Sequence, residues 1–132
     1  MNMDELIEQA KTAKGTAYVP YSNFPVGACV EAEDGYLHQG CNIENASYGL
    51  SNCGERTAIF KAVSTGVRRI NKIAVVADTK DPVAPCGACR QVMSEFMDRD
   101  AEVILANEHG DVKKTTVAEL LPGAFEAGDM DG

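Results

Sequence analysis

Two apolar, β-branched runs on either side of a helical pattern constrain the fold of this chain more than any other feature. Residues 70–77 and 101–106 have the composition of strands that are buried on both faces. Between them, residues 86–97 carry a helical stripe of apolar side chains, namely Cys89, Val92, Met93, Phe96 and Met97. A strand, a helix and a second strand in this order predict a parallel crossover within a sheet that helices cover.

Turn residues and shorter patterns predict the remaining elements. The Asp34-Gly35 pair is a strong hairpin signal between two antiparallel strands, residues 26–33 and 36–43. The other predicted elements are a helix capped by Asp4 and stopped at Gly15, an aromatic loop at 18–25, a polar loop at 42–49, a helix at 53–64, a strand at 112–116 and a helix at 117–121. We therefore expect residues 1–132 to form a single α/β domain, a three-layer α-β-α fold with a mixed five-stranded sheet and helices on both faces.

Three of the five cysteines stand in motifs that suggest a metal site. The motifs are Cys53-Gly54-Glu55 and Pro85-Cys86-Gly87-Ala88-Cys89; each opens a predicted helix, and 32 residues separate Cys53 from Cys86. Thiols three residues apart at a helix start project to one side, and the free N–H groups there favour the thiolate. Three thiolates fill three of the four positions of zinc, and an open fourth position is typical of a catalytic site.

Other interpretations of these cysteines stay open at this point. A lone Cys-x-x-Cys in a reducing compartment also fits a redox pair, although that leaves Cys53-Gly54-Glu55 unexplained. A closed structural zinc site needs a fourth ligand, for which His38 and His109 in the predicted hairpins are the candidates. Cys29 and Cys41 lie on predicted strands and fit small buried residues.

Glu55 follows Cys53 by two residues at a predicted helix start. A carboxylate there can swing over the open metal position, where it would move a proton from water to a leaving group. An isolated glutamate at a helix start is more often a solvated side chain that the helix dipole stabilises. The neighbouring metal motif favours the catalytic interpretation of Glu55.

Charge and hydropathy exclude several classes of function. Twelve Lys and Arg against twenty Asp and Glu leave a net charge of −8, which opposes binding to nucleic acid and to anionic membrane surfaces. The apolar runs are far shorter than the ~20 residues that cross a bilayer. The acidic N-terminus lacks the apolar region of a signal peptide, so we expect a cytoplasmic protein. An odd number of cysteines also argues against a disulfide framework.

With these motifs the sequence resembles the cytidine deaminase family, in its short homotetrameric form with an all-cysteine zinc site. The resemblance covers nearly the whole chain, and besides the cysteine motifs it includes residues 17–28, 42–48 and 120–125. The zinc motif alone indicates the broader deaminase superfamily. The Asn42-Ile43-Glu44 segment narrows the resemblance to nucleoside deaminases.

The resemblance implies one Zn²⁺ per subunit, bound by Cys53, Cys86 and Cys89, with Glu55 as the proton shuttle. Attack of water at C4 of the base would convert cytidine and 2'-deoxycytidine to uridine and 2'-deoxyuridine plus ammonia, a reaction of pyrimidine salvage. Three thiolates around a 2+ ion leave the site formally −1, which blunts the acidification of water. Arg56 is the candidate that compensates, through hydrogen bonds to the sulfurs, although a surface arginine is the other interpretation.

The resemblance also implies the residues that contact the substrate. Asn42 and Glu44 match positions that bind the ribose hydroxyls, and an amide and a carboxylate suit vicinal hydroxyls, although a polar turn would also contain them. Phe24 matches an aromatic pocket wall and fits a core aromatic equally well. Three further residues match positions near the pocket, some of them on neighbouring subunits: Ala46, Tyr48 and Phe125.

Two rival functions also stay open. The first is a deaminase that acts on a free base, a nucleotide or a tRNA adenosine. The acidic net charge of the chain opposes binding of tRNA. A nucleotide would need cations near the pocket, where only Arg56 and Arg90 are available. The second is a zinc-binding module without catalysis. An activity panel separates the first rival from a nucleoside deaminase, and a Glu55→Gln variant separates the second.

Overall fold

The computed structural model describes residues 3–82 and 84–122. Its elements follow the predicted order of helices and strands, with one short 3-10 helix added in the polar loop. They are α1 (Met3–Lys14), β1 (Val26–Ala32), β2 (Leu37–Cys41), the 3-10 helix η1 (Tyr48–Leu50), α2 (Gly54–Ser64), β3 (Ile70–Ala77), α3 (Gly87–Phe96), β4 (Met97–Asn107), β5 (Val112–Thr116) and α4 (Val117–Leu120). Within the described ranges, no helix is both long and apolar enough to cross a membrane.

The strands form one mixed sheet in the order β2-β1-β3-β4-β5. β1 is antiparallel to both β2 and β3, and β5 is antiparallel to β4. β3 and β4 are parallel, with Val75 opposite Leu105, so the predicted crossover through α3 is confirmed. β2 and β3 therefore run in the same direction on the two sides of β1.

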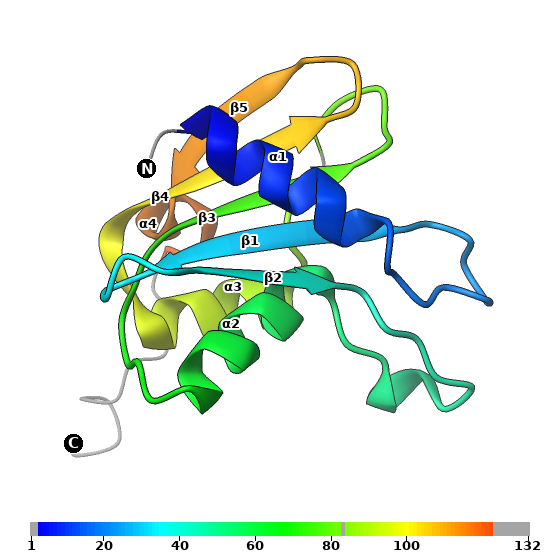
Figure 1. Cartoon of the computed structure of the whole chain (residues 1–132), viewed down its shortest axis with the longest axis horizontal. Helices are drawn as coiled ribbons and strands as arrows, with labels where there is room; N and C mark the ends of the chain where they lie inside the picture. Colours follow the sequence, from blue (N-terminus) through cyan, green and yellow to red (C-terminus); the bar gives the residue numbers. More distant parts are fainter. Residues whose placement is uncertain (1–2, 83, 123–132) are drawn as a thin grey trace.

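Helices cover both faces of the sheet, which confirms the predicted three-layer α-β-α fold. Figure 1 shows α1 lying across one face, where Leu6 and Ala10 pack with Cys29 of β1. On the opposite face α2, α3 and α4 pack against residues that include Val30, the next residue of β1. Successive side chains of a strand point to opposite faces, so one short strand supplies both cores.

Two glycines allow helices to lie unusually close to the sheet. A Cβ atom on Gly27 would lie 2.0 Å from the carbonyl oxygen of Ala10 in α1. A Cβ atom on Gly40 of β2 would lie 2.3 Å from the backbone nitrogen of Ala58 and 2.8 Å from the carbonyl oxygen of Gly54. The start of α2 is therefore pressed directly against β2.

Several predicted boundaries are wrong by a few residues. Helix α1 begins at Met3, so Asp4 lies in its first turn, where a carboxylate is also favourable, and is not its cap. The hairpin strands are shorter than predicted because the turn is wider, with Gly35 at a φ of 85° and the Asp34 carboxylate accepting from the N–H of Tyr36.

Strand β4 begins earlier than predicted. Met97, which we expected at the end of the preceding helix, has extended backbone angles and pairs with Ile70. The charged residues 98–100 are exposed, so they conceal the start of the strand from an analysis of apolar patterns.

Candidate metal centre and active site

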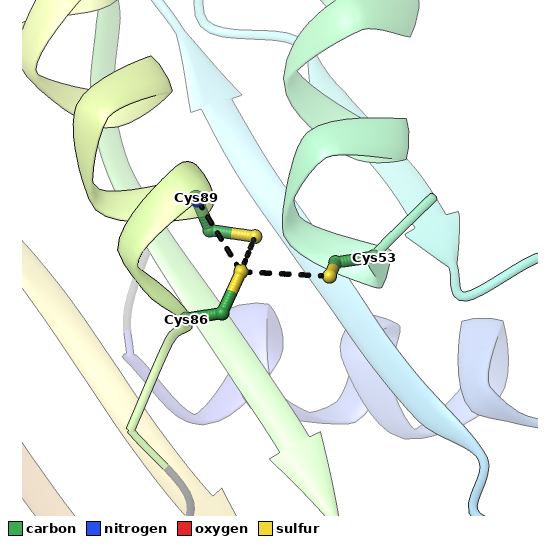
Figure 2. A group of neighbouring side chains, drawn as sticks. All are labelled: Cys53, Cys86 and Cys89. Carbon is green, nitrogen blue, oxygen red and sulfur yellow. Dashed lines mark hydrogen bonds between the residues drawn. The ribbon is translucent and has the colours of Figure 1, made fainter. Parts of the chain in front are cut away.

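The starts of α2 and α3 bring three cysteines together (Figure 2). Cys53 is the N-cap of α2, Cys86 is the N-cap of α3, and Cys89 lies in the first turn of α3. The Sγ atom of Cys86 lies 3.7 Å from the Sγ atom of Cys53 and 3.2 Å from the Sγ atom of Cys89. All three sulfurs are within 4.8 Å of one another. Tetrahedral coordination with zinc–sulfur bonds of ~2.3 Å requires sulfurs about 3.8 Å apart. The cluster therefore fits three ligands of one such ion.

Hydrogen bonds polarise the cysteine cluster. The Cys89 thiol and the Arg56 guanidinium, whose Nη2 donates to Cys53 Sγ at 3.3 Å, lower the pKa of Cys53 to about 5. The hydrogen bond to Cys53 and burial raise the pKa of Cys89. Cys53 thus ionises more readily than Cys89, and a bound metal ion would displace the proton of Cys89 because thiolates are the ligands.

Arg56 is oriented toward the cysteines, as predicted. Its hydrogen bond to the Cys53 sulfur raises the pKa of the guanidinium, which stays charged. Its Nε is buried and has no hydrogen-bond partner among the described residues. The interpretation of Arg56 as a solvated surface residue is therefore wrong.

Glu55 is buried beside this cluster. Its side chain is only 5% exposed, although it lies in the first turn of a helix. Burial raises the pKa of Glu55, and the charge on Cys53 acts in the same direction. Such a carboxyl group can hold a proton more readily than an exposed one. The solvated-glutamate interpretation is therefore wrong.

A cavity of about 310 Å³ opens beside Glu55. Its size is at the lower end for small-molecule sites. It is lined by Ser22, Phe24, Val26, Asn42, Glu44, Cys53, Gly54, Glu55, Val75, Ala84 and Cys86. Three predicted substrate residues, two of the cysteines and the buried carboxyl group therefore share one cavity.

Asn42 and Glu44 hold two loops together at the edge of this cavity. The Asn42 side chain accepts from the N–H of Val26 at 2.9 Å and donates to the carbonyl of Phe24 at 2.8 Å. Oε1 of Glu44 accepts from the N–H groups of Tyr21 and Ser22, both at 3.1 Å. Hydrogen bonds from Ser22 keep the pKa of Glu44 below its usual value. Asn42 and Glu44 thus fix the backbone of residues 21–26, a structural role that the sequence did not predict.

Other predicted site residues have different surroundings. Phe24 lines the cavity and is 37% exposed, so it is not an ordinary core aromatic. Ala46 is exposed and does not line this cavity. Tyr48 is 78% exposed and makes an edge contact with Tyr21, at a ring-centroid distance of 6.5 Å. Phe125 lies outside the described residues.

The histidines do not complete the cluster as a fourth ligand. Among the described residues the metal-binding group contains the three cysteines alone, while His109 Nε2 lies 3.6 Å from an oxygen of Asp78. Cys29 and Cys41 are buried away from it, as predicted, and burial raises the pKa of Cys29 to about 11.

Three further cavity residues, Ser22, Val75 and Ala84, carry no sequence signal of a site. Ser22 and Ala84 lie in irregular segments, and Val75 lies within a strand whose composition indicates only burial. No local pattern marks such residues, because it is the tertiary fold that turns them toward the cavity.

Known proteins similar to this chain are deaminases, and the matching family model describes a zinc-binding region. The family model described as "Cytidine and deoxycytidylate deaminase zinc-binding region" matches residues 1–106. A cytidine deaminase of Sporosarcina psychrophila is 58% identical over 130 residues, covering 98% of this chain and 96% of its own. One of Halalkalibacterium halodurans is 59% identical over 131 residues, covering 99% of each. The crystal structure of cytidine deaminase from Burkholderia pseudomallei superposes with a TM-score of 0.92 at 54% identity, over 95% of this chain and 100% of that one.

Proposed function

The chain belongs to the cytidine and deoxycytidylate deaminase family, and from this membership we propose that it converts cytidine and 2'-deoxycytidine, with water, to uridine and 2'-deoxyuridine plus ammonia. The observation that carries the proposal is the meeting of three thiols, a buried carboxyl group and a nucleoside-sized cavity at one place. Residues 1–132 form one catalytic domain in this proposal, and its role is pyrimidine salvage.

Cys53, Cys86 and Cys89 are the proposed ligands of one Zn²⁺ per subunit. When bound, zinc supplies a Lewis acid that lowers the pKa of water and so makes a nucleophile at neutral pH. Arg56 offsets part of the charge of three thiolates by donating to the Cys53 sulfur. The free thiols of all five cysteines fit a reducing compartment, so the proposed location is the cytoplasm.

Glu55 is the proposed proton shuttle. Its carboxylate accepts one proton from the attacking water and delivers it to N3 of the base. It then carries the second proton, from the new hydroxyl group on C4, to the C4 amino group, so that the C–N bond breaks, ammonia leaves and a carbonyl remains at C4. Burial suits this role because it raises the pKa of the carboxyl group, which brings the protonated and ionised forms closer in energy.

Phe24, Asn42 and Glu44 are the proposed substrate contacts of the chain's own cavity. Glu44 is ionised and rigidly held, so it presents acceptor oxygens to ribose hydroxyls with little further ordering. The amide of Asn42 is fixed in the same way and can add a donor. The ring of Phe24 lines the cavity and can form one of its walls for the base.

A homotetramer is the proposed assembly. Large apolar side chains are exposed on the two loops beside the cavity and on α2, namely Tyr18, Tyr21, Ile43, Tyr48, Leu50 and Phe60. Exposed groups of this kind mark contact surfaces. Ala46, Tyr48 and Phe125 would then act at the pocket of a neighbouring subunit. A fully active monomer in sedimentation experiments would contradict this assembly.

The decisive experiment compares wild type with Glu55→Gln. We expect the variant to keep its zinc and its fold and to lose deamination, measured as the decrease in ultraviolet absorbance of cytidine. Glu95→Gln, a change of an exposed glutamate on α3, is the matched control and should keep full activity. The panel includes cytidine, 2'-deoxycytidine, cytosine, dCMP and adenosine.

Two outcomes contradict the proposal. If the Glu55→Gln variant kept its deaminase activity, the carboxylate of Glu55 would not be the proton shuttle. A wild-type protein that deaminates cytosine, dCMP or adenosine in preference to the nucleosides of cytosine would replace the proposed substrate class.

A further inference from the structure

Arg90 connects the segment in front of a metal-ligand cysteine to the end of α4. Its Nε donates to the carbonyl oxygen of Pro85 at 2.8 Å, and its Nη1 donates to the carbonyl oxygen of Leu120 at 2.9 Å. Pro85 is buried and directly precedes Cys86, while Leu120 is the last residue of α4. One half-buried guanidinium therefore joins two segments that are distant in sequence.

The contact with Pro85 bears directly on the position of Cys86. The peptide group between the two residues is planar, so a donor that fixes the Pro85 carbonyl also restrains the nitrogen and Cα of Cys86. The backbone N–H of Arg90 donates to the carbonyl of Cys86 at 3.0 Å. That second bond comes from the backbone, so most residues at position 90 would make it. The restraint on the Pro85 side of Cys86 depends on the arginine side chain.

Cys86 needs this support more than the other two cysteines. It is exposed, whereas Cys89 is buried and Cys53 is half-buried. Cys86 ends the loop that follows β3, and Asn107 restrains an earlier part of that loop by donating to the carbonyl of Lys80 at 2.9 Å. The part next to the metal ligand is restrained by Arg90.

We propose that Arg90 is a positioning residue, which keeps Cys86 in place for the metal ion and couples this ligand to the end of α4. The inference rests on the proposed zinc site. The planar guanidinium can aim separate N–H groups at two carbonyls, whereas a lysine ammonium is a single point donor on a flexible stem. Arg90→Lys therefore keeps the charge and loses the double contact.

The test measures zinc release from the folded protein. Arg90→Lys and Arg90→Met are loaded with zinc, and transfer of the ion to a chromophoric chelator is followed over time. We expect release about 10- to 100-fold faster than from wild type, the usual range when a group supporting a metal ligand is removed. With Co²⁺ in place of zinc, the thiolate charge-transfer absorption should shift, because it reports the geometry of the sulfurs.

Arg69→Gln is the matched control. Arg69 donates to the carbonyl of Glu95 near the other end of α3 and pairs with Asp98, so it also holds a segment beside this helix, but far from the cysteines. Its zinc release and Co²⁺ spectrum should match those of wild type. Equal acceleration in this variant would show a general loss of stability and overturn the role of Arg90.

The remaining outcomes separate the inference from its premise. Uptake of zinc by wild type, together with unchanged release and an unchanged Co²⁺ spectrum in Arg90→Lys, would overturn the role of Arg90 alone. A wild-type protein that takes up no zinc would overturn the proposed function and this inference together. If Arg90→Met fails to fold, Arg90→Lys decides the question.

Discussion

The two sides of the cavity are built in different ways. On the metal side, Cys53, Glu55 and Cys89 lie at the starts of two helices that pack on the sheet, and Cys89 and Glu55 are buried. On the loop side, Asn42 and Glu44 are half-buried and hold residues 21–26 through side-chain hydrogen bonds to the backbone.

This difference separates two kinds of function within one cavity. Packed elements position groups more accurately than loops, which suits the metal and the proton shuttle. Loops are held by fewer contacts than packed helix starts, so changing one loop side chain should cost less stability. Changes on the metal side should therefore affect metal content and turnover, while changes on the loop side should affect substrate affinity.

The largest effect is expected from Cys89→Ala. The change removes a fully buried sulfur from the cluster, so the protein should lose its zinc and its deamination together. Metal analysis of the purified protein and the ultraviolet assay measure the two losses. Cys29→Ala is the control, because Cys29 is equally buried but packs with α1 on the opposite face of the sheet, and it should keep both properties. A zinc-loaded, active Cys89→Ala protein would break the assignment of the metal side.

The next effect is expected from Gly40→Ala. The added methyl group would lie 2.3 Å from a backbone atom of Ala58, so α2 must move away from β2 and carry Cys53 with it. Overpacking of this kind lowers the free energy of unfolding by about 1–3 kcal/mol. Chemical denaturation measures this loss, and zinc content should fall with it.

Gly49→Ala is the control for this prediction. Among the described residues other than its two chain neighbours, no atom lies within 4 Å of the position of its added Cβ, so the stability of this variant should match that of wild type. Equal stability of Gly40→Ala and wild type would show that the metal side does not depend on close packing of α2.

The smallest effect is expected from Glu44→Gln on the loop side. Loss of the carboxylate weakens hydrogen bonds to ribose hydroxyls, so KM for cytidine should rise about tenfold while kcat and zinc content stay nearly constant. The control substrate is 2',3'-dideoxycytidine, which lacks both hydroxyls and should be affected little by the change. A fall in kcat with unchanged KM would place Glu44 with the metal side and end the distinction between the two sides.

The fold was largely predictable because its main determinants are short-range patterns. The apolar run at 70–77, the helical stripe at 86–97 and the Asp34-Gly35 turn each predict an element that the structure contains. The prediction erred where local signals were ambiguous, as at Met97, which ends a helical stripe and begins a strand.

The sequence by itself determined which residue types were available for chemistry. The cysteine motifs at two helix starts predicted a metal site, and Arg56 was expected beside the sulfurs because of the family resemblance. The cysteine motifs could be interpreted because side chains three residues apart lie on the same side of a helix. Residues close together in the sequence determine that geometry.

Only the tertiary structure decided the environment of these residues. The burial of Glu55 depends on the packing of α2. The bond from Arg90 to the carbonyl of Leu120 and the bonds that Glu44 accepts from the N–H groups of residues 21 and 22 join segments that are far apart in the chain. Desolvation and hydrogen bonding depend on atoms within a few ångströms in space. The sequence does not show which distant residues supply those atoms, because the packing of helices and loops on the sheet brings them together around the cavity.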